Sequence, residues 1–329
     1  RVMKQLQLTQ TGLSLVELMV AMVVRLFLTA GIFSMFVMSA TNVTTTSQFN
    51  QLQENGRIAL WLLERDVSQL GFMGDLTGIG LEVGRNLDIN AAAVAAGNDC
   101  IGDGVNNGSF PAVVPAHFRR LWGYESGVSA NSLSCLTSVL SATDVLQIKR
   151  LAGPEVATPN DSNRYYLATN SQQGVLFSGD QTAPVLTIGR YWEYLHHVYY
   201  IEDEAGTPVL KRRVLRNGGM KTSASYEQLV EGVENMRVLY GFDSNGDNSA
   251  DSYMPVQNVT DLMWDNSLAQ RIVSLRIFML IRSVEADNSY TNNNTYELGD
   301  KTITAPGDHF RRKVVSTTLV LENPIIGAN

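Results

Sequence analysis

Charged residues are scarce in this chain: Asp, Glu, Lys and Arg make up 17% of its 329 residues, against about 25% in an average globular domain. With 44% hydrophobic residues and only nine prolines, the composition excludes a disordered chain and a collagen-like repeat. The net charge is −7. An acidic chain is not expected to coat nucleic acid generally, because that requires a strongly basic surface.

The scarcity of charge is concentrated near the N-terminus. Only four charged side chains occur in residues 1–53, namely Arg1, Lys4, Glu17 and Arg25. Residues 18–37 form an apolar run that is long enough, as a helix, to cross a bilayer core of roughly 30 Å. A single run excludes a polytopic membrane protein. Because two cations precede it and polar residues follow it, the positive-inside rule predicts a cytoplasmic N-terminus and a body outside the membrane.

Residue types that serve catalysts and metal centres are equally scarce. The chain has two cysteines and four histidines, without CxxC or Cys/His metal spacing. His196 and His197 are adjacent in a strand pattern, so their side chains point to opposite faces and cannot act on one ligand. There is no GxSxG, HExxH, phosphate-binding loop or dinucleotide fingerprint. We therefore expect the protein not to be an enzyme.

A motif at the start of the apolar run carries more information. Glu17 begins the run, where a carboxylate is costly unless something pairs with it, and it follows the sequence Gly12-Leu13-Ser14-Leu15-Val16. This resembles the type IV pilin signature, which implies that a prepilin peptidase cleaves after Gly12 and that Leu13 becomes the N-methylated first residue. The resemblance also implies that Glu17 neutralises the α-amino group of a neighbouring subunit in the filament core, where an unpaired ion costs several kcal/mol.

Arg25 departs from that pattern, since it lies within the apolar run. Membrane-insertion scales assign such a residue a cost of roughly 2.5–3.5 kcal/mol. Two interpretations stay open: Arg25 extends to the membrane interface, or it has a role in assembly by pairing with a carboxylate on a partner helix.

The predicted helix extends past the apolar run. Apolar or small residues continue at a spacing of three or four, at Phe49, Leu52, Gly56, Ala59, Leu63, Val67 and Leu70. This spacing is typical of one helix face, and charged residues such as Glu64 and Asp66 are expected mainly elsewhere. Gly71 then provides a stop, so we predict a helix over residues 13–70.

Further motifs resemble the PilW family of minor pilins. They are Leu52-Gln53-Glu54-Asn55-Gly56-Arg57, Leu63-Glu64-Arg65-Asp66, Gly71-Phe72, Asp144-Val145-Leu146, Leu229-Val230-Glu231-Gly232-Val233-Glu234, Tyr240-Gly241-Phe242-Asp243 and Arg311-Arg312-Lys313. The resemblance implies a non-catalytic minor pilin that takes part in priming assembly of a type IV pilus and lies in its tip complex. Whether such a pilus serves twitching motility, adhesion or DNA uptake stays open.

The same resemblance implies the partners and the location. The partners would be other minor pilins, the major pilin, a tip adhesin, the inner-membrane assembly platform and the prepilin peptidase. The precursor would be a single-pass inner-membrane protein, and the assembled form would lie in the periplasmic and extracellular pilus. The alternatives are a minor pseudopilin of a type II secretion system, and a membrane-tethered module that binds a ligand or DNA.

The remainder of the chain predicts a β-rich body. Residues 74–140 have little periodicity and are expected to form loops with short helices. Alternating or β-branched patterns predict strands over residues 144–150, 193–202, 208–215, 271–282 and 314–321. A long helix followed by strands predicts an α+β, type IV pilin-like fold with a mostly antiparallel sheet. The expected divisions are a leader (1–12), a transmembrane or filament-core half of the helix (13–39), an amphipathic half (40–71) and a globular domain (72–329).

Cys100 and Cys135 lie in the part predicted to be outside the inner membrane. An even number of cysteines in an oxidising compartment predicts one disulfide. Two free thiols are the alternative.

One segment resembles a metal-binding loop. Asp243, Asn245, Asp247, Ser249 and Asp251 occupy alternate positions, 1 to 9, of an EF-hand-type calcium loop. Position 6 is Asn248, which tolerates the left-handed conformation, and position 12 is Met254, so the bidentate carboxylate is missing. We expect Ca²⁺ at this loop; the alternative is an Asx-rich turn without an ion.

Three basic clusters are a weak sign of nucleic-acid binding. They are Arg119-Arg120, Lys211-Arg212-Arg213 and Arg311-Arg312-Lys313. Contact with DNA is one interpretation, and solvated strand faces are the other.

Overall fold

The computed structural model describes residues 12, 14–95, 97–102, 104, 107–111, 114–221 and 228–323. Contacts within the chain separate residues 1–50 from residues 51–329, and each part is described by itself. The leader residues 1–11 and Leu13, which carry part of the predicted cleavage and methylation site, lie outside the described residues. The predicted divisions after residues 12, 39 and 71 stay predictions.

One long helix, α1 (Leu15–Val67), begins the described chain. It lies within the predicted range of 13–70 and is slightly shorter at both ends. In the part that belongs to the body, Leu52, Ala59, Leu63 and Val67 are fully buried, which confirms the predicted apolar stripe. The chain turns at Gly71, whose φ of +84° lies in the left-handed region that favours glycine.

The larger sheet of the body has the strand order β10-β9-β8-β6-β7-β2-β1-β3, with β5 and then β4 joined to β8, and β11 joined to β9. Its strands are β1 (Glu82–Val83), β2 (Leu87–Ile89), β3 (Ala116–His117), β4 (Leu121–Glu125), β5 (Asp144–Ala152), β6 (Tyr165–Thr169), β7 (Gly174–Ser178), β8 (Arg190–Glu204), β9 (Thr207–Arg216), β10 (Gly219–Lys221) and β11 (Gln228–Glu231). Only the pairs β1–β2 and β2–β7 are parallel among these described strands.

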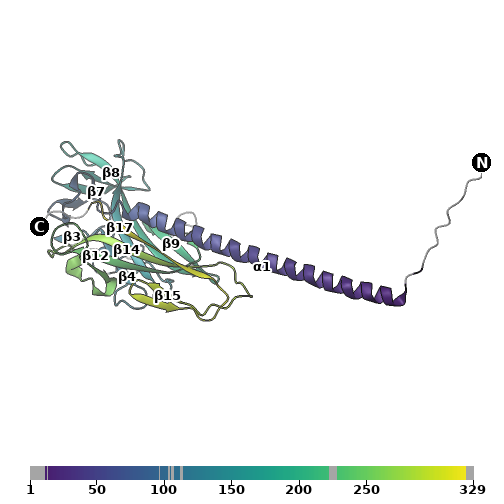
Figure 1. Ribbon diagram of the computed structural model, residues 1–329. Helices are drawn as coiled ribbons and strands as arrows, with labels where there is room; N and C mark the ends of the chain where they lie inside the picture. The colour runs from purple at the N-terminus through teal and green to yellow at the C-terminus, as the bar shows by residue number, and fades with distance from the viewer. Residues whose placement is uncertain are drawn as a thin grey trace, which may run out of the picture. The chain divides into compact units, whose positions relative to one another are not determined.

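The second sheet has the order β13-β12-β14-β17 and is antiparallel throughout (Figure 1). Its strands are β12 (Val233–Asp243), β13 (Ser252–Pro255), β14 (Arg271–Arg282) and β17 (Arg312–Val320), and a separate hairpin is made of β15 (Thr295–Leu298) and β16 (Lys301–Thr304). Short helical turns are η1 (Gly74–Leu76), η3 (Val256–Asn258) and α3 (Asp261–Trp264). The architecture is therefore the predicted one, a long helix followed by a mostly antiparallel β body.

Each of the five predicted strands is present, and β14 has the predicted bounds. The region 74–140 differs from the prediction, because it contains the short strands β1 to β4 as well as the turn η1. All five residues of β4 are buried. Its sequence, Leu-Trp-Gly-Tyr-Glu, has no alternation of polar and apolar residues by which it could be recognised.

One hydrophobic core joins the end of α1 to both sheets. Leu52 and Leu63 of α1, Leu146 and Tyr199 of the larger sheet, and Leu275 of the second sheet all belong to it. At Gly56 the helix backbone lies so close to β17 that an added Cβ would be 2.9 Å from the Cγ1 of Val315. The helix end is thus part of the fold of the body.

Candidate functional site

The start of α1 is organised by Ser14 and Glu17. The Ser14 N–H donates to the Glu17 carboxylate at 2.9 Å, and the Val16 N–H donates to the Ser14 hydroxyl at 3.3 Å. Ser14 and Glu17 thus cap the helix start much as Ser-x-x-Glu sequences do, with the Ser14 hydroxyl accepting from the second residue of the helix and the Glu17 carboxylate accepting from the Ser14 N–H. The Ser-x-x-Glu spacing is a sequence signal for such a cap, so Glu17 has a local role in addition to the one predicted in assembly. The cleavage site and the intersubunit role of Glu17 stay predictions.

The first part of α1 presents apolar side chains on every side. Residues such as Leu26, Phe27, Phe33 and Met35 are each more than 65% exposed. Among the described residues, α1 is the one helix long and apolar enough to cross a membrane, and its most apolar stretch has no buried residue. Apolar surface of this extent requires a membrane or neighbouring helices to cover it. The helix is compatible with membrane anchoring.

Arg25 lies exposed on this surface. It has no ion pair with any residue in the part of the chain that the structure describes. Both interpretations of Arg25 stay predictions.

Asp66, in the last turn of α1, is buried, contrary to the prediction from the sequence. The sequence pattern placed it mainly off the buried face, but it is 3% exposed. Its carboxylate accepts hydrogen bonds from Arg150 Nε at 2.6 Å, His197 Nδ1 at 2.6 Å and the Tyr199 hydroxyl at 2.7 Å. Burial alone would raise the pKa of Asp66, but His197, Arg150 and Tyr199 hold it well below its usual range. These bonds join the helix to β5 and β8.

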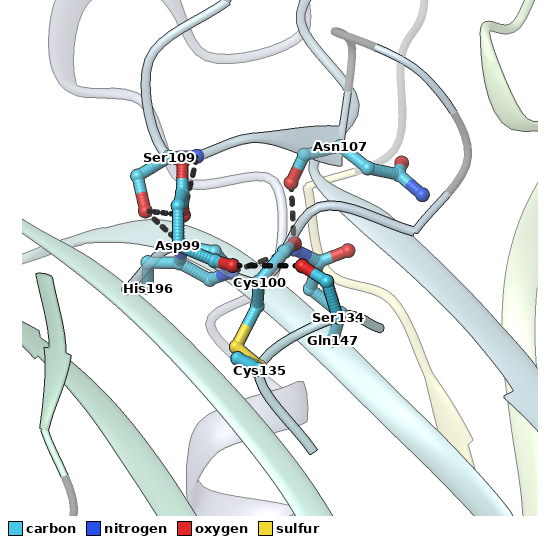
Figure 2. Close-up of a disulfide and its surroundings, with 8 residues drawn as sticks. All are labelled: Asp99, Cys100, Asn107, Ser109, Ser134, Cys135, Gln147 and His196. Atoms are coloured by element: carbon cyan, nitrogen blue, oxygen red, sulfur yellow. Dashed lines mark hydrogen bonds between the residues drawn. A yellow bond between two sulfur atoms is a disulfide. The ribbon is translucent and has the colours of Figure 1, made fainter. Parts of the chain in front are cut away.

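His196 belongs to a different buried network, beside the disulfide (Figure 2). Its Nδ1 lies 2.8 Å from the Ser109 hydroxyl, which in turn donates to Asp99 at 2.7 Å. Its Nε2 lies 2.7 Å from the amide nitrogen of Gln147. The two adjacent histidines therefore point to opposite sides, as expected, and both have internal hydrogen-bonding roles.

Cys100 and Cys135 are joined in a disulfide, with their Cα atoms 4.8 Å apart (Figure 2). The prediction of one disulfide is confirmed. The bond joins the segment before β3 to the segment after β4, and Ser134 beside it donates to the Asp99 carbonyl at 3.2 Å.

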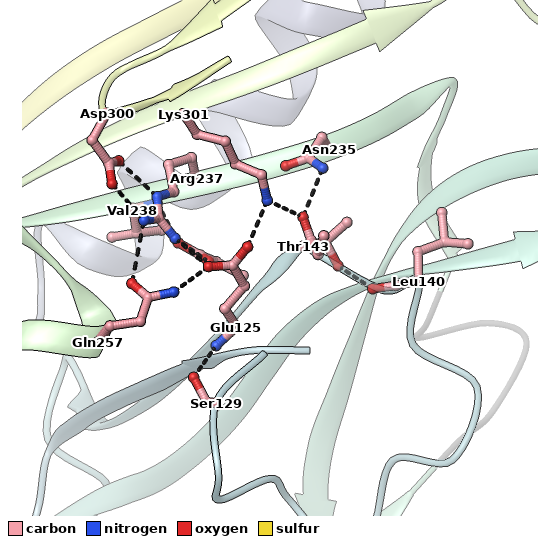
Figure 3. A network of polar contacts seen from close by, with 12 residues as sticks. Glu125, Ser129, Leu140, Thr143, Asn235, Arg237, Val238, Gln257, Asp300 and Lys301 are labelled. Atoms are coloured by element: carbon pink, nitrogen blue, oxygen red, sulfur yellow. Dashed lines mark hydrogen bonds and ion pairs between the residues drawn. The ribbon is translucent and has the colours of Figure 1, made fainter. Parts of the chain in front are cut away.

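A third network joins the two sheets around Arg237 of β12 (Figure 3). The guanidinium donates to Asp300 at 2.6 Å and to Glu125 at 2.8 Å, and it lies 3.2 Å from Asp144. Lys301 donates to the other oxygen of Glu125 at 2.6 Å. Burial raises the pKa of Asp144 to about 7, although Arg237 acts against that rise. This network was not predicted from the sequence, because its members are charged residues from separate strands and a hairpin.

The predicted calcium loop follows β12. Asn248 has a φ of +63°, which confirms that it adopts the expected left-handed conformation. The Asp243 carboxylate accepts from the N–H groups of Asn245, Gly246 and Asn248 at 2.7–3.0 Å, and Asp251 accepts from Ser244 N at 2.7 Å. Among the described residues, no three His, Cys, Asp or Glu side chains are grouped so as to hold a metal ion. The loop geometry suits an Asx-rich turn, and calcium binding stays a prediction.

Each basic cluster contains at least one cation that is buried and not part of a solvated strand face, whereas Arg212, Arg213, Arg311 and Lys313 are half-buried. Arg119, Lys211 and Arg312 are each less than 9% exposed. Arg119 pairs with Asp265 at 2.6 Å, Lys211 with Glu202 at 2.9 Å, and Arg312 with Asp308 at 2.6 Å. These cations are engaged within the chain, so they offer little to the phosphates of a nucleic acid.

Comparison with known proteins points to one family. Residues 198–323, from β8 to the last described residue, match the family model of PilW, the type IV pilus-assembly protein W. The resemblance to the PilW family is confirmed for this part of the chain. The PilW-like region contains the second sheet and most of the Arg237 network, whereas the motifs at residues 12–72 and 144–146 lie outside it.

The comparisons with curated proteins and with solved structures give less information about the family. No curated protein matches the chain. A type IV-like pilin from Thermus thermophilus, TTHA1219, is a structural neighbour with 11% sequence identity, a TM-score of 0.35, and coverage of 83% of this chain and 96% of its own. The PilW match and the helix-plus-β architecture support a pilin role and imply interaction with other components of a pilus.

Proposed function

We propose that this protein is a minor pilin that takes part in priming assembly of a type IV pilus, lies in its tip complex and acts by assembly rather than catalysis. The supporting observation is the first part of α1, whose apolar side chains are exposed around its whole circumference while Glu17 lies at its start. Such a surface suits a helix that first lies in the inner membrane and then packs among other pilin helices. The PilW match supports the choice of a pilus system.

The proposed partners follow from this surface and this family. Residues 15–43 of α1 would contact the helices of the other minor pilins and the major pilin. The β body would contact neighbouring minor pilins and a tip adhesin. Before assembly, the prepilin peptidase would act after Gly12, and the assembly platform would extract the subunit from the membrane.

Substitution of Glu17 tests the proposal in a deletion strain complemented with variants. We expect the Glu17→Val protein to remain in the membrane fraction and to enter sheared surface pili at least about tenfold less, because a pair worth more than about 1.4 kcal/mol shifts an equilibrium that far. Glu54→Gln, on an exposed helical position, is the matched control and should enter pili normally. Normal entry of Glu17→Val would contradict the proposal.

The deletion strain separates the alternatives. Loss of surface pili with normal enzyme secretion supports the minor pilin, and the reverse supports a type II pseudopilin. Arg25→Leu in the same assay distinguishes its two interpretations, because reduced co-purification with neighbouring pilins is expected only if Arg25 pairs with a partner helix.

A further inference from the structure

Among the residues of the body that the structure describes, five arginines are buried: Arg119, Arg120, Arg150, Arg237 and Arg312. Four of them pair with carboxylates at short distances, because the loss of hydration of a buried cation must be offset by a nearby negative charge. The pairs are Arg119–Asp265, Arg150–Asp66, Arg237–Asp300 and Arg312–Asp308, all at 2.6 Å.

Arg120 is the exception. It is 8% exposed, and among the described residues its guanidinium has a single contact, from Nη1 to the Gly71 carbonyl at 3.5 Å. No carboxylate of the described residues lies within ion-pairing distance of it. A guanidinium carries five N–H donors in a planar fork, so most of its donors have no partner among the described residues.

The guanidinium lines a cavity of about 40 Å³ beyond the end of α1. Leu121, Trp264, Ile272 and Leu321 give it apolar walls, and Asn266 and Asn323 also line it. One water molecule needs about 10–15 Å³ measured in this way, so the cavity has room for a carboxylate group. Apolar walls strengthen a charge pair by excluding water.

The electrostatics of Arg120 agree with this geometry. Burial lowers the pKa of Arg120 to about 10, without an opposing carboxylate. At Arg237 and Arg312 burial also acts to lower the pKa, but their carboxylate partners outweigh it and raise the pKa above the usual value. Arg120 is thus buried like the four paired arginines, but no carboxylate of the described residues pairs with it.

We propose that the Arg120 cavity is a binding site for one compact carboxylate, held by the guanidinium fork against the wall formed by Trp264. The ligand is either a small free carboxylic acid or an acidic side chain of another protein chain, since both present the same group. The geometry of the fork favours a carboxylate over a spherical anion, because two parallel N–H groups match its two oxygens. This inference does not depend on the pilus function proposed above.

Acetate is the probe that tests the site. The full chain in detergent is dialysed into buffer free of carboxylic acids, and sodium acetate then replaces sodium chloride at constant ionic strength. We expect the melting temperature to rise by about 2–4 °C when acetate reaches roughly ten times its Kd, with a change in tryptophan fluorescence that Trp264→Phe abolishes. Arg120→Met should lose the rise in melting temperature, whereas Arg57→Met, on an exposed arginine, should keep it.

A second probe distinguishes the two sources. Aspartate blocked at both ends presents the carboxylate as a side chain does; stabilisation by this compound as well as by acetate indicates a protein ligand, and stabilisation by acetate alone indicates a free acid. If Arg120→Met does not fold, Arg120→Lys keeps the charge without the fork and should require several-fold more acetate. No acetate effect on the wild-type chain, or an equal effect in the Arg120 variant, overturns the proposal.

Discussion

At the scale of single residues, His196 illustrates how surroundings determine a protonation state. The Gln147 amide nitrogen must donate to the Asn107 carbonyl at 2.8 Å, so it presents N–H, not oxygen, to His196 Nε2. Nε2 is therefore an acceptor, and Nδ1 carries the proton. A second proton, on Nε2, would face the N–H group of Gln147, which is itself a donor. This agrees with the pKa of His196, which burial lowers strongly.

A pH dependence of stability follows from both adjacent histidines. Burial lowers the pKa of His197 as well, with Asp66 opposing it. Because the unfolded chain binds protons near pH 6.5 and His196 in the folded chain binds them only at a much lower pH, the free energy of unfolding should fall as the pH drops below 6.5, by up to about 1.4 kcal/mol per pH unit for His196. His197 contributes in the same direction. Asp144 acts in the opposite direction, since its raised pKa of about 7 lets the folded chain take up a proton first.

Urea unfolding at pH 7.5 and pH 5.5 measures this dependence. Between pH 7.5 and pH 5.5, the change in the free energy of unfolding should be about 1.4 kcal/mol more favourable to the folded state in His196→Gln than in the wild-type chain. His309→Gln, on an exposed side chain, is the matched control. The same pH dependence in His196→Gln as in the wild-type chain would show that the folded protein accommodates a proton on this ring.

The loop from Asp243 to Asp251 makes a separate prediction at this scale. If Ca²⁺ binds, titration calorimetry of the full chain should show a Kd on the order of 10⁻⁴–10⁻³ M, since the bidentate ligand of position 12 is replaced by Met254. Asp243→Asn combined with Asp251→Asn should abolish the heat. The absence of both heat and thermal stabilisation at about 5 mM calcium, several times that Kd, would leave the Asx-rich turn as the correct interpretation.

At the scale of elements, Asp66 fixes the last turn of α1 to the larger sheet. Asp66→Asn removes the charge that compensates Arg150, so we expect the free energy of unfolding to fall by about 3–5 kcal/mol. Glu54→Gln, which breaks an exposed pair with Arg57 on the same helix, should cost less than about 1 kcal/mol. Urea unfolding of both variants measures the difference, and equal small losses would mean that water or another group replaces the missing charge.

The elements that sequence could predict are those with a local signal. Strand β14 was predicted with its correct bounds because its apolar residues alternate over its length, and α1 because its stripe repeats at helical spacing. Asp66 and Arg237 could not be predicted as buried, since their ion-pair partners lie 63–131 residues away in sequence and charge normally indicates exposure. The Arg120 cavity has no sequence signal, because its walls come together only in the folded body.

At the scale of the whole molecule, the body depends on buried charge to place its parts. Arg237 joins β12 to β4, β5 and the β15–β16 hairpin, so it sets the second sheet against the larger one. Asp66 does the same for the helix and the larger sheet. Hydrogen bonds and ion pairs are directional, so they fix the relative positions of these elements more closely than apolar contacts alone would.

The contact between α1 and β17 has a consequence for the order of events during synthesis. Thr317 donates to Glu64 at 2.7 Å across 253 positions of sequence, and a Cβ on Gly71 would lie 2.1 Å from the carbonyl oxygen of Asn323. The end of α1 thus completes its packing only against segments that are made about 250 residues later. The disulfide closes a loop of 35 positions and can form much earlier. The end of α1 can therefore pack fully only after β17 has been made. Until then its apolar stripe is exposed and prone to aggregation.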